Sequence, residues 1–263
     1  MKPAKFEYEK PRALDDALAL LAQANGEGKL IAGGQSLGPM LNLRLAQPQL
    51  LVDVRALPEL TAVRGERDAV FIGAATTHAA IEDGKVEDPT NGFLRHVARG
   101  IAYRAVRNRG TLGGSLAHAD PAADWVSAMA ALDAGIVVRG AGGEREIRAS
   151  EWMHGIMSTA MGPEEVLVGV RVPRLSGRAR WSYWKFCRKT GEFAEAIAAF
   201  VVDPERNAWR GVMGATGGAP VVVEDARELD PAAVAAEAFE PGTYEHQVHS
   251  VALKRAAAQL GSA

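Results

Sequence analysis

Cysteine is almost absent from this sequence, which has one thiol, Cys187, among 263 residues. One cysteine cannot form an intrachain disulfide, and it cannot supply the thiolates that a Cys-rich zinc site or an iron–sulfur cluster needs. Long hydrophobic runs are also missing, because the longest, Met129–Val138, is interrupted by Asp133 and is too short to cross a bilayer. The amino terminus is polar and has no apolar core of a secretory signal. We therefore expect a cytoplasmic protein without a metal site of its own.

An excess of charge of one sign is lacking too. The chain has 30 basic and 32 acidic residues, for a formal net charge of −2, and this balance gives no indication of nucleic-acid or membrane-surface binding. Hydrophobic residues make up 48% of the chain and charged residues 24%, which is typical of globular proteins with a sizeable core. The length suits one large domain or two modest ones.

The amino-terminal segment is predicted to form a β–α–β unit. Leu14, Leu18 and Leu21 are spaced as on one face of a helix. Short apolar strands are predicted over Lys29–Ala32 and Leu50–Val54. Two strands joined by a crossover favour a small parallel sheet at this end of the chain.

The remainder of the chain mixes strands and helices, so the predicted fold class is α+β. A lapse of periodicity over 174–178 predicts a boundary, and Ala-rich helices are expected at the carboxyl end. The predicted elements are strands near 70–72, 136–139, 145–147, 166–172, 181–187, 196–202 and 208–214, helices over 77–82, 92–98 and 125–132, and a glycine-containing loop over 108–115.

The first glycine motif is Ala32-Gly33-Gly34-Gln35-Ser36-Leu37. Adjacent glycines after a strand allow consecutive backbone N–H groups to turn toward one point and form a concave anion site, to which a Ser hydroxyl adds a donor. The motif is not a P-loop, because Pro39-Met40 stands where Lys-Ser/Thr is required, and its glycine spacing is not that of the Rossmann fingerprint. A plain tight turn between strand and helix is the alternative.

The second glycine motif is Arg109-Gly110-Thr111-Leu112-Gly113-Gly114-Ser115, which again combines adjacent glycines with hydroxyl side chains. Arg104, Arg107 and Arg109 provide positive charge that could favour an anion, whereas Asp120 and Asp124 could accept hydrogen bonds from hydroxyl groups. Two phosphate cradles beside a hydroxyl-accepting carboxylate match a ligand with a pyrophosphate and a polyol chain, as in FAD. The alternative is an ordinary glycine loop followed by a helix that begins at a proline.

With a third segment, Lys185-Phe186-Cys187-Arg188 and Gly191-Glu192-Phe193-Ala194, the two motifs resemble the FAD-binding medium subunit of molybdenum hydroxylases, the family of xanthine dehydrogenases and aerobic carbon monoxide dehydrogenases. The resemblance runs from about residue 3 to about residue 258. It implies a two-subdomain FAD-binding fold (PCMH-type) followed by a C-terminal α+β domain with a small antiparallel sheet and helices. The implied limits are 1–175, with subdomains of about 1–57 and 58–175, and 178–263.

The resemblance also implies a division of labour. FAD would be held by this chain, while [2Fe-2S] clusters and the molybdenum cofactor would be held by a small and a large partner subunit in a dimer of heterotrimers, a heterohexamer. Electrons would pass from the clusters to this chain and on to an external acceptor, and the hydroxylation itself would take place on the large subunit. The single cysteine agrees with clusters housed elsewhere.

Residue roles follow from the same resemblance. The two glycine motifs would hold the pyrophosphate, Asp124 the ribityl chain, and Ile101 and Leu167 would pack on the flavin or adenine. Lys185 would donate to a flavin carbonyl and raise its reduction potential, and Phe193, a Tyr in some relatives, would lie near the ring face. The full set of cofactor-binding residues is Ala32, Gly33, Gly34, Gln35, Ser36, Leu37, Ile101, Thr111, Gly113, Gly114, Ser115, His118, Asp124, Leu167, Lys185 and Phe193, with no catalytic residue and no metal ligand.

Other features have simpler interpretations. His118 is expected to hydrogen-bond locally, and His246 with His249 is expected on a solvated helix face, since no further metal ligands are evident. Two other functions stay open: a stand-alone flavin-dependent oxidase or reductase, which would act on a small substrate by itself, and a non-enzymatic scaffold, which would purify colourless. The substrate and the terminal electron acceptor cannot be read from this chain.

Overall fold

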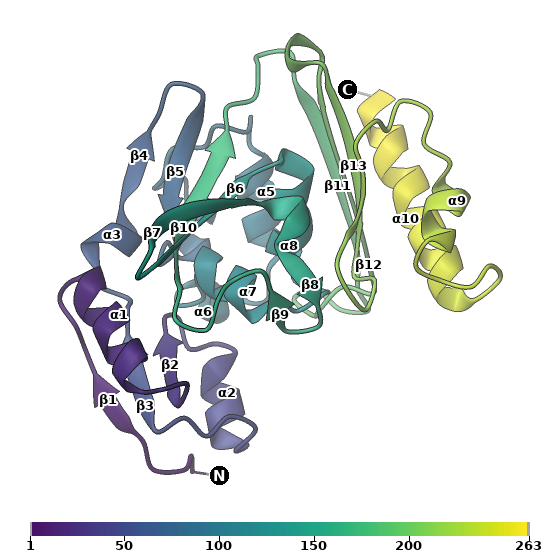
Figure 1. Cartoon of the computed structure of the whole chain (residues 1–263). Helices are drawn as coiled ribbons and strands as arrows, with labels where there is room; N and C mark the ends of the chain where they lie inside the picture. The colour runs from purple at the N-terminus through teal and green to yellow at the C-terminus, as the bar shows by residue number, and fades with distance from the viewer. Residues whose placement is uncertain (1, 262–263) are drawn as a thin grey trace.

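The computed structural model describes residues 2–261, and its architecture is α+β as predicted (Figure 1). A three-stranded sheet at the amino-terminal end has the order β1-β3-β2, and both of its pairings are parallel. The predicted parallel β–α–β unit is therefore confirmed. Its elements are β1 (Glu7–Glu9), α1 (Leu14–Gln23), β2 (Gly28–Ile31), α2 (Leu37–Asn42) and β3 (Leu50–Asp53).

Helix α1 packs on this sheet through the apolar face that its sequence predicts. Leu14, Ala17 and Leu21 are buried, and Leu18 lies partly buried against the same core. The helix has no side-chain cap of its own, but the amide of Leu14 donates to Glu59 Oε1 at 3.2 Å. The Glu59 carboxylate thus satisfies an amide of the first turn of α1 and ties this helix to the segment that follows β3.

A five-stranded antiparallel sheet forms the centre of the molecule, with the strand order β4-β5-β10-β6-β7. Helices α4 to α8 connect and cover its strands. The elements are α3 (Pro58–Thr61), β4 (Val63–Gly65), β5 (Ala69–Gly73), α4 (His78–Glu82), α5 (Phe93–Gly100), α6 (Arg104–Arg107), α7 (Leu112–His118), α8 (Asp124–Leu132), β6 (Gly135–Gly140), β7 (Gly143–Arg148), η1 (Ala149–Glu151), β8 (Met153–Gly155), β9 (Ser158–Thr159) and β10 (Val166–Pro173).

A second layered unit follows and is built on a four-stranded antiparallel sheet, β11-β12-β13-β14. In Figure 1 this sheet stands between α8 on one side and the yellow helices α9 and α10 on the other. Its elements are β11 (Arg180–Phe186), β12 (Ala196–Asp203), η2 (Pro204–Arg206), β13 (Ala208–Gly214), β14 (Val221–Val223), α9 (Pro231–Ala236) and α10 (Tyr244–Gly261).

Strand β12 is buried along its whole length because both faces of its sheet are covered. Ile197, Ala199 and Val201 belong to the large central core that includes α8, whereas Ala198 and Phe200 belong to the core shared with α9 and α10. Successive side chains of a strand point to opposite faces. The continuous apolar run in the sequence therefore reflects two cores, one on each side.

The segment between β10 and β11, which joins the central sheet to the second layered unit, is held by a buried carboxylate. The Ser176 amide and Oγ donate to the Asp203 carboxylate at 2.8 and 2.6 Å. These bonds keep the pKa of Asp203 below its usual value despite its burial. Within residues 2–261, no helix has both the length and the apolar character needed to cross a membrane. The predicted domain limits near residues 175 and 178 stay a prediction.

The segment around the second glycine motif differs in one respect from the sequence-based expectations. The segment 108–115, predicted to be a loop, enters helix α7 at Leu112, because the Thr111 side chain accepts from the Gly114 amide at 3.0 Å and caps the helix. Helix α8 begins at Asp124, one residue before the predicted start, and ends at Leu132 as predicted. The second glycine motif is thus half loop and half helix.

Candidate functional site

The two glycine motifs, far apart in sequence, lie against each other in the structure. A Cβ atom on Gly33 would lie only 2.2 Å from the carbonyl oxygen of Arg109 and 2.8 Å from the Cα of Gly110. The Arg109 side chain also donates from Nε to the Gly33 carbonyl oxygen at 3.4 Å. Only a residue without a side chain permits this backbone contact. The prediction that both motifs face one ligand is consistent with this arrangement.

The first motif presents unbonded backbone donors. It follows strand β2, and Gly34 has a positive φ of 70°, which turns the chain sharply. Among the residues that the structure describes, none accepts from the amide nitrogens of Gly33, Gly34, Gln35, Ser36 or Leu37. Unsatisfied consecutive amides in a glycine turn form a concave site for an anion such as a pyrophosphate. The residues present therefore fit the phosphate part of FAD.

The second motif offers fewer free amides. The amide of Leu112 donates to Thr76 O at 2.9 Å, and that of Gly113 donates to Ala74 O at 2.9 Å. Gly113 must be a glycine here, because a Cβ would lie 2.4 Å from the Cβ of Ala74. With the Gly114 amide bonded to Thr111, the donors left for a ligand are mainly the Thr111 and Ser115 hydroxyls.

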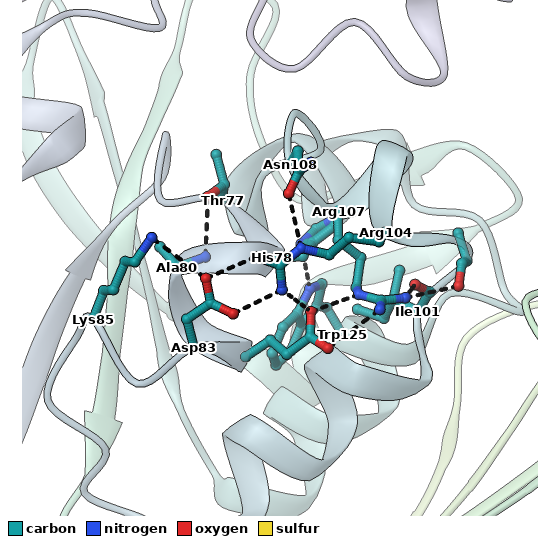
Figure 2. Close-up of polar contacts among 12 residues, drawn as sticks. Thr77, His78, Ala80, Asp83, Lys85, Ile101, Arg104, Arg107, Asn108 and Trp125 are labelled. Carbon is teal, nitrogen blue, oxygen red and sulfur yellow. Dashed lines mark hydrogen bonds and ion pairs between the residues drawn. The ribbon is translucent and has the colours of Figure 1, made fainter.

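The positive charge expected beside the second motif is largely neutralised. Arg104 bonds Asp83 through two nitrogens, each at 2.7 Å, and Glu82 at 2.8 Å, while Arg107 bonds Glu82 at 2.7 Å (Figure 2). Arg107 also donates to two backbone carbonyls at the end of α5. These guanidinium groups lower the pKa of Glu82. Both arginines therefore brace α4 against α6, and the expectation that they favour a bound anion is not supported.

A buried histidine that sequence reasoning missed lies next to the second motif. His78 is 5% exposed at the start of α4, and its Nδ1 accepts from Trp125 Nε1 at 3.0 Å (Figure 2). The His78 amide donates to the Gly110 carbonyl at 2.9 Å. Burial, with a smaller effect of Arg107, lowers the pKa of His78 to about 4, so the ring is neutral at pH 7. Nothing in the sequence marks His78, because its partners lie 32 or more positions away.

Two residues expected to contact FAD contact each other. Asp124, the first residue of α8, accepts from Lys185 Nζ at 2.8 Å and from Tyr183 Oη at 2.7 Å. Lys185 Nζ also lies 3.2 Å from the carbonyl oxygen of Gly100, to which it donates. Burial raises the pKa of Asp124, against the opposing effect of Lys185, and it raises the pKa of Tyr183 well above its usual value. This cluster joins α8 and α5 to strand β11.

The other predicted ligand residues are distributed as follows. Ile101 lies half-buried at the end of α5, and Leu167 is buried in β10. Phe193 is 64% exposed in the loop between β11 and β12, so its ring is accessible. His118 is the last residue of α7, and no side-chain hydrogen bond of it is found in the described part of the chain. The roles of these residues toward FAD stay predictions.

The rings of the two carboxy-terminal histidines face main-chain carbonyl oxygens. His249 is 1% exposed and its ring nitrogens face the carbonyl oxygens of Glu245, Gly214 and Ala215, so the expected solvated face is wrong for this residue. His246 Nε2 lies 3.1 Å from the carbonyl oxygen of Ala232. Among residues 2–261, no three His, Cys, Asp or Glu side chains are grouped to hold a metal ion.

A protein-family model and several characterised proteins are similar to this chain. The family model described as the FAD binding domain in molybdopterin dehydrogenase matches residues 4–175. The carbon monoxide dehydrogenase medium chain of Hydrogenophaga pseudoflava is 39% identical over 207 residues, covering 79% of this chain and 72% of the relative. The nicotine 6-hydroxylase medium subunit of Paenarthrobacter nicotinovorans is 36% identical over 220 residues, covering 83% and 76%.

Solved structures agree over the full length. Carbon monoxide dehydrogenase from H. pseudoflava, in a form that lacks the Mo-pyranopterin moiety of its cofactor, matches with a TM-score of 0.91 at 32% identity, covering 100% of this chain and 99% of that chain. Quinoline 2-oxidoreductase from Pseudomonas putida 86 matches with a TM-score of 0.86 at 29% identity and the same coverage. The fold class expected from the motifs is confirmed.

Proposed function

This chain belongs to the family of FAD-binding domains of molybdopterin dehydrogenases, and from that premise we propose that it is the electron-transfer subunit of a heteromeric molybdenum hydroxylase. The resemblance inferred from the motifs is thereby confirmed at the level of the family, and the chain is an oxidoreductase subunit with an FAD-binding domain. We place it between the [2Fe-2S] clusters of a small partner subunit and an external electron acceptor.

The observation that carries the proposal is the backbone contact between the two glycine motifs. It places the unbonded amides of Gly33 to Leu37 beside the hydroxyl-bearing start of α7. Backbone amides and hydroxyls are neutral donors, so they hold a pyrophosphate without the positive side chains that Arg104 and Arg107 have committed elsewhere. FAD is a ligand with such a group, and when bound it supplies the redox chemistry.

The protein residues orient and shield this group. In our assignment, the first motif and the Thr111 and Ser115 hydroxyls would hold the pyrophosphate, and the exposed Phe193 ring would lie near the flavin. Asp124 would serve the ribityl chain and Lys185 the flavin ring as one ion pair without net charge, because Lys185 Nζ lies 2.8 Å from the Asp124 carboxylate. Lys185 therefore contributes less to the flavin potential than a free cation would.

The partner assignment rests on chemistry and on the relatives. The resemblance to this family implies that the clusters lie in a small iron–sulfur subunit and that hydroxylation takes place on a large molybdenum subunit, and we propose the same arrangement for this chain, as a dimer of heterotrimers in the cytoplasm. The single cysteine agrees with clusters housed on another subunit. The relatives carry names that refer to carbon monoxide, caffeine and nicotine. Similar subunits in enzymes with such different names support a substrate site outside this subunit.

The test is the visible spectrum of the full-length chain, purified alone and then co-purified with its partner subunits. We expect bound flavin, released by acid as FAD, in both preparations, and additional iron–sulfur absorbance only in the second. Turnover of a small substrate by the chain alone would instead favour a stand-alone flavoenzyme. A protein that stays colourless after incubation with FAD would refute the assignment of the glycine motifs.

A further inference from the structure

We propose that His78 and Trp125 are positioning residues that set the spacing between the two glycine motifs and so shape the pyrophosphate site. This inference rests on the proposed binding of FAD at these motifs. It concerns residues of α4 and α8 that carry no motif and are not themselves expected to touch the cofactor.

His78 contacts the second glycine motif at Gly110. A Cβ on Gly110 would lie 2.8 Å from Nε2 of His78, so the edge of the imidazole ring lies directly against the Gly110 backbone. The backbone of the same histidine reinforces this contact, because its amide donates to the Gly110 carbonyl at 2.9 Å. Thr77 and Thr111 form a β-bridge alongside. Both the ring and the main chain at residue 78 therefore hold Gly110 in place.

The second step is the fixing of the ring itself. Trp125 is fully buried in α8, and its indole N–H donates to His78 Nδ1 at 3.0 Å. An acceptor at Nδ1 requires the neutral ring with its proton on Nε2. The hydrogen bond, drawn in Figure 2, thus selects one tautomer and one ring orientation. Because the ring lies against Gly110, it also couples the central helix α8 to the position of Gly110.

The third step leads from Gly110 to the first motif. The Gly33 backbone packs on Arg109 and Gly110 with no room for a single methyl group. A shift of Gly110 toward or away from His78 therefore moves the surface on which Gly33 and its unbonded amides rest. The contacts form one series, from Trp125 to His78, to Gly110 and to Gly33. Packed contacts of this kind transmit small displacements instead of absorbing them.

The experiment uses the full-length chain and four variants. Trp125→Phe removes the indole donor, His78→Leu removes the acceptor and the polar ring edge, and His78→Asn restores an acceptor at the position of Nδ1. A double variant, Trp125→Phe with His78→Leu, tests coupling. The controls are Trp181→Phe, which removes an indole donor to Asn91 O, and His246→Leu, which removes a ring that faces Ala232 O in α9.

Three quantities are measured: the FAD dissociation constant, the ³¹P chemical shifts of the bound pyrophosphate, and amide hydrogen exchange of residues 109–116 without FAD. We expect Trp125→Phe and His78→Leu each to weaken FAD binding about tenfold, which is the worth of one buried hydrogen bond, with altered ³¹P shifts and faster exchange. His78→Asn should recover part of the loss, and the double variant should bind no more weakly than His78→Leu alone.

The outcomes separate cleanly. Equal losses in the two controls, or unchanged ³¹P shifts in variants that lose affinity, would mean a general packing defect and would overturn the inference. If His78→Leu does not fold, the same three measurements on Trp125→Phe test the inference. This variant keeps the His78 ring and most of the volume of the Trp125 side chain. Failure of the wild-type chain to bind FAD would overturn the proposed function, and this inference with it, irrespective of the variants.

Discussion

Replacement of Gly33 by alanine is the sharpest test of the site, because the added atom meets main chain and not a flexible side chain. The new Cβ would lie 2.2 Å from Arg109 O and 2.7 Å from the Arg109 carbonyl carbon. An ordinary carbon–oxygen contact is about 3.3 Å, so the two motifs must separate by about 1 Å. Neither backbone can move freely, since Gly110 is held between Gly33 and His78.

The magnitude follows from overpacking. Forcing a methyl group into a closed contact costs about 1–3 kcal/mol, and we expect the free energy of unfolding to fall by this amount. Separation of the motifs should also weaken FAD binding, and a similar energy corresponds to about a 5- to 150-fold rise in the dissociation constant. Gly38→Ala is the matched control, because a Cβ there meets nothing within 4 Å and the position lies in helix α2.

The assay is a fluorescence titration with FAD together with urea unfolding of the FAD-free protein. For Gly38→Ala we expect unchanged affinity and unchanged or slightly raised stability, since alanine favours helix. The reasoning is refuted if Gly33→Ala binds FAD as tightly as the wild type and unfolds at the same urea concentration. A loss of affinity shared equally by Gly38→Ala would likewise show that the contact with Arg109 is not the cause.

Three further predictions concern charge. The folded-state pKa of His78, about 4, lies below its usual 6.5, so the unfolded chain binds a proton that the folded chain does not bind between these two pH values. The free energy of unfolding should therefore be highest above pH 6.5 and fall by about 3 kcal/mol as the pH drops to 4. Urea unfolding at several pH values should show this fall for the wild type and not for His78→Asn. Lys185→Met leaves the Asp124 carboxylate buried without its cation and should lower the free energy of unfolding by about 3–5 kcal/mol. The double variant Lys185→Met with Asp124→Asn has no buried charge at this place and should recover most of the lost stability. Equal stabilities of the single and the double variant would contradict the buried pair. Arg104→Gln should leave the FAD dissociation constant within about twofold, because this arginine is already paired with carboxylates; a tenfold rise would show that its charge acts on the ligand.

Local and periodic features of the fold were accessible from the sequence. The spacing of leucines in α1 and the apolar run of β12 predict their elements because each depends on a repeat of the chain itself. The two glycine motifs predict a phosphate site because adjacent glycines allow consecutive backbone amides to turn toward one point, although a plain turn can have the same composition. The start of α7 was missed because the helix depends on one hydroxyl, that of Thr111, capping the chain.

Contacts between side chains from distant segments could not be predicted from the sequence. Asp124 and Lys185 are 61 positions apart, and Trp125 and His78 are 47 positions apart. Which groups meet depends on how α4, α8 and β11 pack, and neither residue type nor spacing specifies it. For the same reason the arginines before the second motif look available for an anion in the sequence, although Glu82 and Asp83 take up their charge in the fold.

The contact of Gly33 with Arg109 spans 76 positions of sequence, and this separation has a consequence for biosynthesis. Domains form as the chain emerges from the ribosome, with the amino-terminal end first. A nascent chain that ends after α2 already contains the first motif, but it has no second surface for a cofactor to bridge. In the site proposed above, cofactor binding therefore requires the chain at least through α7, and our inference for His78 adds α8, which carries Trp125. In the proposed site, flavin binding therefore depends on the folding of the central core, whose sheet is completed only by the later strands β6, β7 and β10.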